Sequence, residues 1–185
     1  MKFKFQYNKK TFTAEVPRCW DEVTVSQFQK MNFSTWDGID IVHLLSILSG
    51  ADLKALYETK SKPMKAVYAA MSFLKEEPIE WEALKHKTAI IYQGKMIRIP
   101  EDLENEAFGL MLEFQQFAES DNIAAIAALY LQPVIDGKID KQRRLDIEIE
   151  ILKMPILEIL PIVNFFFRKS REYRIFGKPV LNLYQ

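Results

Sequence analysis

The sequence contains one cysteine, two histidines and six glycines, and this scarcity excludes several kinds of chemistry. The single cysteine, Cys19, cannot form an intramolecular disulfide, and a zinc site of the cysteine-rich kind is excluded with it. We therefore expect a reducing compartment, in which Cys19 serves as a small buried apolar residue. No glycine lies in a phosphate-binding frame such as GxGxxG or GxxxxGK[ST], and no Gly-x-Ser-x-Gly elbow exists.

The chain also lacks an excess of charge, because 25 basic residues balance 25 acidic ones. Such a balance gives no global attraction to nucleic acid or to an anionic membrane. The longest apolar run, residues 156–167, contains Glu158, Pro161 and Asn164 and is too short to span a bilayer. The first residues alternate charged and aromatic side chains, so we expect no signal peptide and an intracellular protein.

The histidines give no sign of a metal site. His43 lies among apolar residues of a predicted helix, where we expect a core or boundary residue, and His86 lies between lysines in a polar connector. The two histidines belong to different halves of the chain, so they could bind one metal ion only if the fold happened to bring them together. We expect no metal and no cofactor.

Carboxylates cluster at residues 101–106 and 146–150. The first cluster falls at a predicted helix start, where negative charge complements the helix dipole. In the second cluster, we expect Glu148 to be solvated or to pair with a basic residue, namely Lys141, Arg143 or Arg144. A paired-carboxylate acid/base site is the sharper alternative for such a cluster.

Two parts of the chain show the period-2 alternation of short β-strands joined by a polar turn. The predicted strands are residues 2–7 and 11–16 in the first half and residues 88–92 and 95–99 in the second. A proline, which cannot donate a ladder hydrogen bond, follows each pair, at Pro17 and at Pro100. The sequence therefore predicts two β-hairpins.

Helical patterns follow each hairpin. The predicted helices cover residues 25–33, 37–49, 52–59, 63–75, 104–118, 123–131 and 145–153, with a last helix opened by Pro155. Thr24 and Gln27 match a capping box, and Asp52 and Asn122 are predicted N-caps. We expect the helix that starts at residue 123 to end before Pro133.

The same order of elements in both halves predicts an internal duplication. The expected fold is α+β and mostly α-helical, with two β-hairpins each followed by a helical bundle. The predicted parts are residues 1–78 for the first repeat, 87–170 for the second and 171–185 for a C-terminal arm. An open alternative is that the two hairpins join in one small sheet.

Aromatic residues near the C-terminus indicate a contact surface. Phe165, Phe166 and Phe167 are consecutive, so on a helix they cover nearly its whole circumference, and at least one should point away from the local core. The arm has no counterpart in the first half, and we expect it to dock on an adjacent subunit or to pack back on its own domain. The interface candidates in the arm are Tyr173, Phe176, Leu181, Leu183 and Tyr184.

Two stretches resemble a known group of proteins. They are VPRCWDEVTVSQF at residues 16–28 and IVHLLSILSG at residues 41–50, followed near the C-terminus by Met154, Pro155 and the Phe-rich helix. Together they are similar to small proteins from the virion and tail morphogenesis genes of tailed phages and prophages of the Bacteroides group. The resemblance covers most of the chain in outline, and its motif is a fold signature without catalytic residues.

The resemblance implies that the protein is not an enzyme but a structural component of a tailed-phage virion, a subunit of a head–tail connector or tail ring. The implied partners are further copies of itself and other neck or tail proteins, with no membrane and no nucleic acid except DNA in a channel that the ring would line. The implied location is the virion, and the host cytoplasm during assembly.

Two alternatives accompany this interpretation. One is a tail assembly chaperone, which is absent from the mature particle. The other is a hydrolase or nucleic-acid enzyme whose site residues are scattered in the sequence. A pocket lined by Glu148 and His43 would support this alternative.

Overall fold

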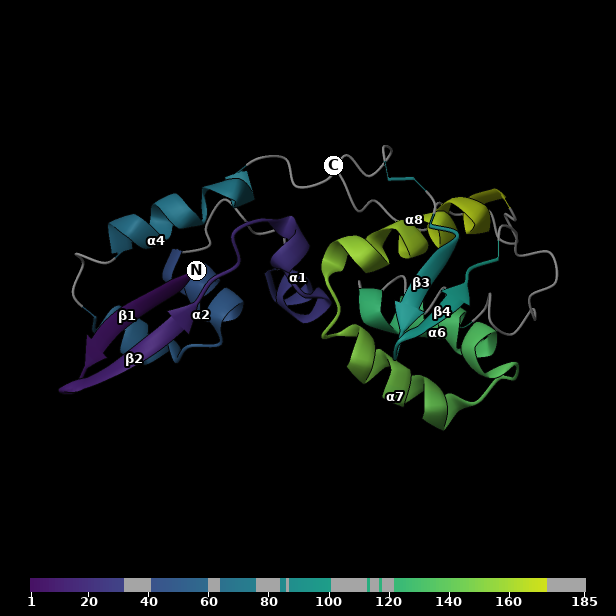
Figure 1. Cartoon of the computed structure of the whole chain (residues 1–185), viewed down its shortest axis with the longest axis horizontal. Helices are drawn as coiled ribbons and strands as arrows, with labels where there is room; N and C mark the ends of the chain where they lie inside the picture. The colour runs from purple at the N-terminus through teal and green to yellow at the C-terminus, as the bar shows by residue number, and fades with distance from the viewer. Residues whose placement is uncertain are drawn as a thin grey trace. The chain divides into compact units, whose positions relative to one another are not determined.

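The computed structural model describes residues 1–31, 41–59, 64–75, 84–85, 87–100, 113, 117 and 122–172 of the chain. They form a mixed α+β structure rich in helix, so the predicted fold class is confirmed. The chain divides into two compact units, Met1–Ile79 (unit 1) and Glu80–Gln185 (unit 2) (Figure 1). Each unit contains a hairpin of its own, because the described strands form two separate two-stranded sheets.

The hairpin of unit 1 consists of β1 (Lys2–Tyr7) and β2 (Lys10–Glu15). Its turn residues Asn8 and Lys9 have φ angles of 48° and 61°, the left-handed pair that a two-residue type I′ turn requires. The register sets Phe5 opposite Phe12, and their rings stack with centroids 5.4 Å apart. Phe5 faces the core of the unit, as the alternation of the strand predicts.

Of the described helical segments of unit 1, two begin where a predicted cap lies, and the one at residues 20–22 was not predicted; the predicted starts at residues 37 and 63 lie outside the described residues. The described segments are the 3₁₀ helix η1 (Trp20–Glu22), α1 (Val25–Met31), α2 (Ile41–Ser49), α3 (Leu53–Tyr57), α4 (Met64–Ala70) and the 3₁₀ helix η3 (Ser72–Lys75). The capping box is confirmed, since Thr24 N–H donates to Gln27 Oε1 at 2.8 Å and Gln27 N–H donates to Thr24 Oγ1 at 3.2 Å. The Asp52 cap is confirmed too, because its carboxylate accepts from the N–H of Ala55.

The core of unit 1 lies between the hairpin and its helices. Helix α2 packs on β2 and α3 packs on β1. The ring of Trp20 adds a second aromatic cluster, because it meets Phe28 and Phe73 edge to face. Several residues of the segments that carry the resemblance, Val16 and Trp20 among them, are thus core residues of this unit.

The first strands described in unit 2 are β3 (Ala89–Tyr92) and β4 (Lys95–Arg98), again joined by a two-residue turn. Gln93 and Gly94 have φ angles of 49° and 74°, so this turn has the same left-handed geometry as the first. The helices described over their full length are α6 (Ile123–Asp136), α7 (Lys141–Ile151) and α8 (Ile156–Glu172). The predicted helix at residues 104–118 lies outside the described residues except at positions 113 and 117, which are helical.

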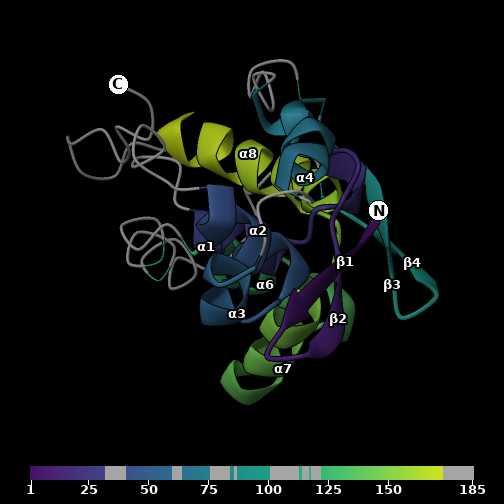
Figure 2. The same cartoon turned by 90° about the vertical axis from the view of Figure 1, so that its left-hand side faces the viewer.

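Helix α6 is the centre of unit 2. It packs against both α7 and α8, which lie on opposite sides of it (Figures 1 and 2). Its residues from Ala124 to Gln132 are all buried, as expected of a helix that is apolar all round. The hydroxyl of Tyr130 donates to the carbonyl of Pro100 at 3.1 Å and so ties α6 to the end of the hairpin.

The prediction that α6 ends before Pro133 is wrong. The helix continues to Asp136, and Gly137, with φ of 67°, ends it by donating to the carbonyl of Pro133 at 2.8 Å. A proline removes the hydrogen bond of its own N–H, but the buried Gln132 side chain supports the last turn by donating to the carbonyl of Lys138 at 2.7 Å and accepting from the N–H of Asp140 at 3.0 Å. The Asn122 cap at the other end is confirmed.

The predicted start of α7 is also wrong. The helix begins at Lys141 instead of residue 145, because the Asp140 carboxylate caps it by accepting from the N–H groups of Gln142 and Arg143, both at 3.1 Å. The basic residues after Gly137 obscured this cap in the sequence. The helix therefore carries its basic residues in the first half and its acidic residues in the second.

Candidate functional site

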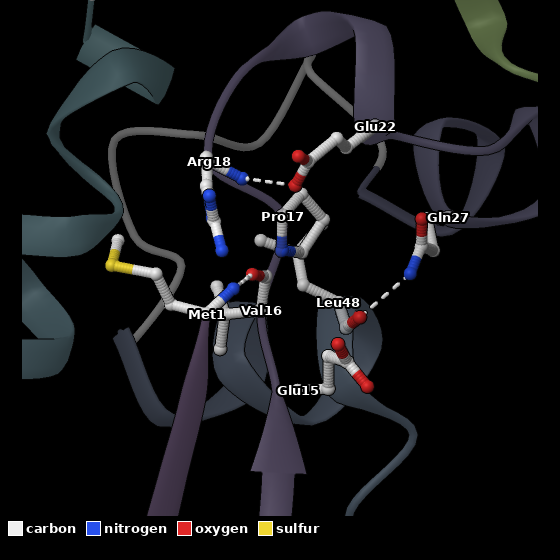
Figure 3. Close-up of a pocket in the computed structure, with 8 residues that line it drawn as sticks. All are labelled: Met1, Glu15, Val16, Pro17, Arg18, Glu22, Gln27 and Leu48. Atoms are coloured by element: carbon white, nitrogen blue, oxygen red, sulfur yellow. Dashed lines mark hydrogen bonds between the residues drawn. The ribbon is translucent and has the colours of Figure 1, made fainter.

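A shallow pocket of about 320 Å³ lies at the base of the unit 1 hairpin, within the segment that carries the resemblance. Its lining residues come from the N-terminal Met1, β2, the loop after it, η1, α1 and α2, and are shown in Figure 3. They are Met1, Glu15, Val16, Pro17, Arg18, Glu22, Gln27 and Leu48.

The polar groups of this pocket serve the fold. The carboxylate of Glu22 accepts from the backbone N–H of Arg18 at 2.9 Å, and Gln27 donates its side-chain N–H to the carbonyl of Leu48 at 2.6 Å (Figure 3). Glu15 pairs with Lys2 across the hairpin at 3.6 Å. These contacts hold a strand, a loop and two helices together, so the polar groups of the pocket stabilise the fold of unit 1.

The residues considered for chemistry lie apart from this pocket. His43 is exposed on α2, where its Nδ1 is 3.2 Å from the hydroxyl of Tyr57, so the predicted core or boundary position proves to be a surface one. Cys19 is exposed as well, and the prediction that it is buried is wrong. It lies in the short loop directly before η1. His86 and the carboxylates of residues 101–106 lie outside the described residues.

The acidic half of α7 is engaged with neighbouring elements. Glu148 accepts from the side-chain N–H of Asn122 at 3.1 Å, a partner that the sequence did not predict. Glu150 accepts two hydrogen bonds from Gln93, at 2.8 and 3.0 Å, and these join the tip of the hairpin to α7. Burial, reinforced by the nearby Glu150 carboxylate, raises the pKa of Tyr92 to about 12.

The basic half of α7 is held by Glu113. The carboxylate of Glu113 bonds to the guanidinium of Arg144 and lies 3.4 Å from Lys141 Nζ, while Arg143 pairs with Asp136 at 3.6 Å. Burial alone would raise the pKa of Glu113, but the hydrogen bonds and positive charges of Arg144 and Lys141 outweigh it and hold that pKa below its usual value. These groups form a structural ion-pair network.

The three phenylalanines of α8 have different surroundings. Phe166 is buried, 2% exposed, and meets the ring of Tyr130 edge to face with centroids 4.9 Å apart. Phe165 and Phe167 are half-buried, and Phe165 also touches Tyr130, at 6.3 Å between centroids. Phe166 therefore belongs to the core of unit 2. The arm candidates Tyr173, Phe176, Leu181, Leu183 and Tyr184 lie outside the described residues.

Large apolar side chains are exposed on the hairpin and on α7 of unit 2. On the hairpin, Ile91 is 68% exposed and Met96 is 74% exposed, and the register sets them directly opposite each other. On α7, Leu145 is 52% exposed and Ile149 is 54% exposed, one helical turn apart. Contiguous exposed apolar side chains commonly mark contacts with other proteins.

The sequence contains a signal for the exposed residues of α7. Leu145, Ile147, Ile149 and Ile151 alternate with acidic residues, and successive members of the series lie roughly 200° apart around a helix. A helix cannot bury such a series on one face. In the structure Ile147 and Ile151 are buried, and the other two face solvent.

The described parts of both units offer no metal-binding cluster and no membrane-spanning helix. There, no group of three or more His, Cys, Asp or Glu side chains is arranged to hold a metal ion. Within the same ranges, no helix is both long enough and apolar enough to cross a bilayer.

The surfaces of unit 2 are therefore the strongest candidate site, and unit 1 contributes a structural pocket. His43 belongs to unit 1 and Glu148 to unit 2, and neither residue lines the described pocket. Comparison with family models, with curated proteins and with solved structures finds no match to this chain.

Proposed function

We propose that this protein is a non-enzymatic structural component of a tailed-phage virion, working as a subunit of a head–tail connector or tail ring. The choice of particle rests on the resemblance of residues 16–28 and 41–50 to phage virion and tail morphogenesis proteins. The role in assembly rests on the surface of unit 2.

The observation that carries the assembly role is the exposure of four large apolar side chains on two elements of unit 2. Each of them, Ile91, Met96, Leu145 and Ile149, is more than half exposed. Leaving such side chains in water forgoes roughly 1.5–3 kcal/mol per residue relative to full burial. A protein that is built into a larger particle recovers this free energy when its neighbours cover them.

A tail assembly chaperone would also expose apolar side chains, and the two functions differ in where the protein ends up. A ring subunit stays in the finished particle at a fixed copy number. A chaperone covers its client during assembly and is released. In both cases the partner is another protein. The carboxylates of Glu113, Glu148 and Glu150 bond neighbouring side chains of unit 2.

Mass spectrometry of purified particles from the source phage, alongside the crude lysate, tests the proposal. We expect the protein in the particle, at a constant ratio to the major capsid protein across preparations. Detection in the lysate alone would replace the ring subunit by the chaperone. Absence from both, in an infection that expresses the gene, would overturn the proposal.

A further inference from the structure

The outer face of the unit 2 hairpin forms a compact surface that we call the hairpin patch, defined by Ile91, Met96 and Arg98. Ile91 and Met96 are cross-strand partners, and Arg98 follows Met96 by two residues, so all three side chains lie on one face. All three are exposed. The hairpin from residue 89 to residue 98 contains the basic residues Lys95 and Arg98 and no acidic residue.

The outer face of α7 forms a second surface, the helix patch, defined by Leu145, Asp146 and Ile149. Leu145 and Ile149 are four residues apart and Asp146 is three residues before Ile149, so they are neighbours on one helix face. All three are exposed. Residues 145–151 contain three acidic residues and no basic one.

The two patches are complementary in chemistry. Each has a pair of large apolar side chains at its centre and one charged group beside them, positive on the hairpin patch and negative on the helix patch. Among the described residues neither Arg98 nor Asp146 forms an ion pair. The basic residues of α7, in contrast, already pair with Glu113 and Asp136. Charge complementarity of this kind steers association and selects the partner.

We propose that the hairpin patch of one copy of this chain packs on the helix patch of a second copy. Within one chain both patches stay exposed, so they do not cover each other. Two helix patches would set acidic surfaces against each other, and two hairpin patches would set basic surfaces together. The hairpin-to-helix pairing alone joins apolar centres while bringing opposite charges together.

This contact is heterologous, because each copy contributes a different patch and keeps the other one available. Repetition of a heterologous contact produces a ring if the rotation between copies closes, and a filament if it does not. Closure into a ring rests on the proposed function, whereas the contact itself rests on the patches. A stable interface buries roughly 800 Å² per partner, so the six defining side chains form its centre and their neighbours form its rim.

The test uses the purified full chain and variants with one patch broken. Met96→Glu places a charge in the hairpin patch and Ile149→Glu places one in the helix patch, and both positions are more than half exposed, so we expect both variants to fold. We expect the parent protein to form oligomers that grow with concentration in sedimentation velocity, and each variant alone to be monomeric.

An equimolar mixture of the two variants gives the decisive result. The Met96→Glu copy keeps its helix patch and the Ile149→Glu copy keeps its hairpin patch, so one contact can form between them and no further copy can add. We expect a heterodimer that does not grow. Dimers of Met96→Glu alone would indicate helix-to-helix pairing and overturn the proposal, as would a mixture that stays monomeric or a monomeric parent.

A charge exchange sharpens the assignment. We expect Arg98→Glu and Asp146→Arg each to weaken self-association by about fivefold to tenfold, and the double variant to restore it. A double variant weaker than either single one would contradict the proposed pairing. Tyr68→Glu, on α4 of unit 1 at a position 49% exposed, is the matched control and should assemble like the parent.

The two proposals fail separately. Monomeric protein that is nevertheless found in particles would remove the self-contact and leave the structural role. Self-association of a protein that never enters particles would support the self-contact and overturn the structural role. Far-ultraviolet circular dichroism and thermal unfolding of every variant establish that loss of association is not loss of folding.

Discussion

The two hairpins of this chain share their backbone geometry and differ in how they use their outer faces. Each has a two-residue turn in which both residues have positive φ. On the unit 1 hairpin the outer face carries Lys4 opposite Thr13, and apolar side chains turn inward. Nearer its turn the same face carries Gln6 opposite Thr11, both exposed, and at the corresponding positions the unit 2 hairpin carries Ile91 opposite Met96, also exposed. Unit 1 shows that the hairpin folds with a polar outer face, so the fold alone does not require apolar residues there.

The largest expected difference in stability is between a substitution on the inner face of the unit 1 hairpin and one on the outer face of the unit 2 hairpin. Phe5→Ala removes a ring that is 1% exposed and stacked on Phe12, and should lower the free energy of unfolding by about 3–5 kcal/mol. Ile91→Ala, on the exposed face, should cost less than about 1 kcal/mol. Urea denaturation of both variants measures the difference. Equal losses would place Ile91 in the core and end the comparison.

Ion pairs should show the next difference between the units. Lys2 and Glu15 in unit 1 are 3.6 Å apart with side chains 69% and 68% exposed, whereas the Arg144 side chain in unit 2 is 10% exposed. Arg144→Ala leaves the Glu113 carboxylate without its buried partner and should cost about 1–3 kcal/mol, and Lys2→Ala should cost less than about 1 kcal/mol. Similar losses in the same denaturation experiment would show that the network around Arg144 behaves as a surface pair.

The same network predicts how stability depends on pH. The pKa of Glu113 is lowered in the folded state. Its ionised carboxylate therefore stabilises the folded protein fully at pH values above the pKa of the unfolded state, which is about 4.3. This stabilisation is lost as the pH falls through the lower pKa of the folded state. Glu113→Gln should remove this part of the acid dependence. Thermal unfolding of parent and variant between neutral and acidic pH measures this contribution. The same loss of stability toward acidic pH in both proteins would exclude a role of Glu113 in the pH dependence.

The smallest effect concerns the turns and should be reciprocal. Lys9 occupies a left-handed position without being glycine, so Lys9→Gly should stabilise unit 1 by about 1 kcal/mol. Gly94 occupies the equivalent position in unit 2, and a Cβ atom added there would have no neighbour within 4 Å. Gly94→Lys should therefore destabilise by a similar amount through backbone strain alone, which urea denaturation measures. Changes of the same sign in the two variants would contradict equivalent turns.

Elements with local signals were the ones that the sequence predicted. The Thr24 and Gln27 capping box, the Asp52 and Asn122 caps and both hairpins follow from residues only a few positions apart, and each is confirmed. Pro133 misled because the buried Gln132 side chain bonds to Lys138 and Asp140, beyond the helix, and so supports the last turn despite a local helix breaker. The sequence also did not show which ring of α8 is buried, because burial depends on packing against residues far along the chain.

The candidate site was harder to predict than the fold. The sequence drew attention to the Phe-rich helix, where Phe166 proves to be core, and passed over Ile91 and Ile149. The alternating run of α7 fits either a strand with one buried face or a helix with divided faces, and the pattern alone did not show which of its apolar residues face solvent. Exposure of an apolar residue depends on which neighbours cover it, and no local pattern encodes that.

The exposed thiol of Cys19 offers a practical consequence. The chain has one cysteine, and it lies on the surface of unit 1, in a different part of the sequence from both patches of unit 2. A maleimide dye therefore attaches at a single known place without any engineered substitution. Because each copy then carries one fluorophore, the number of photobleaching steps from a single complex counts its subunits directly.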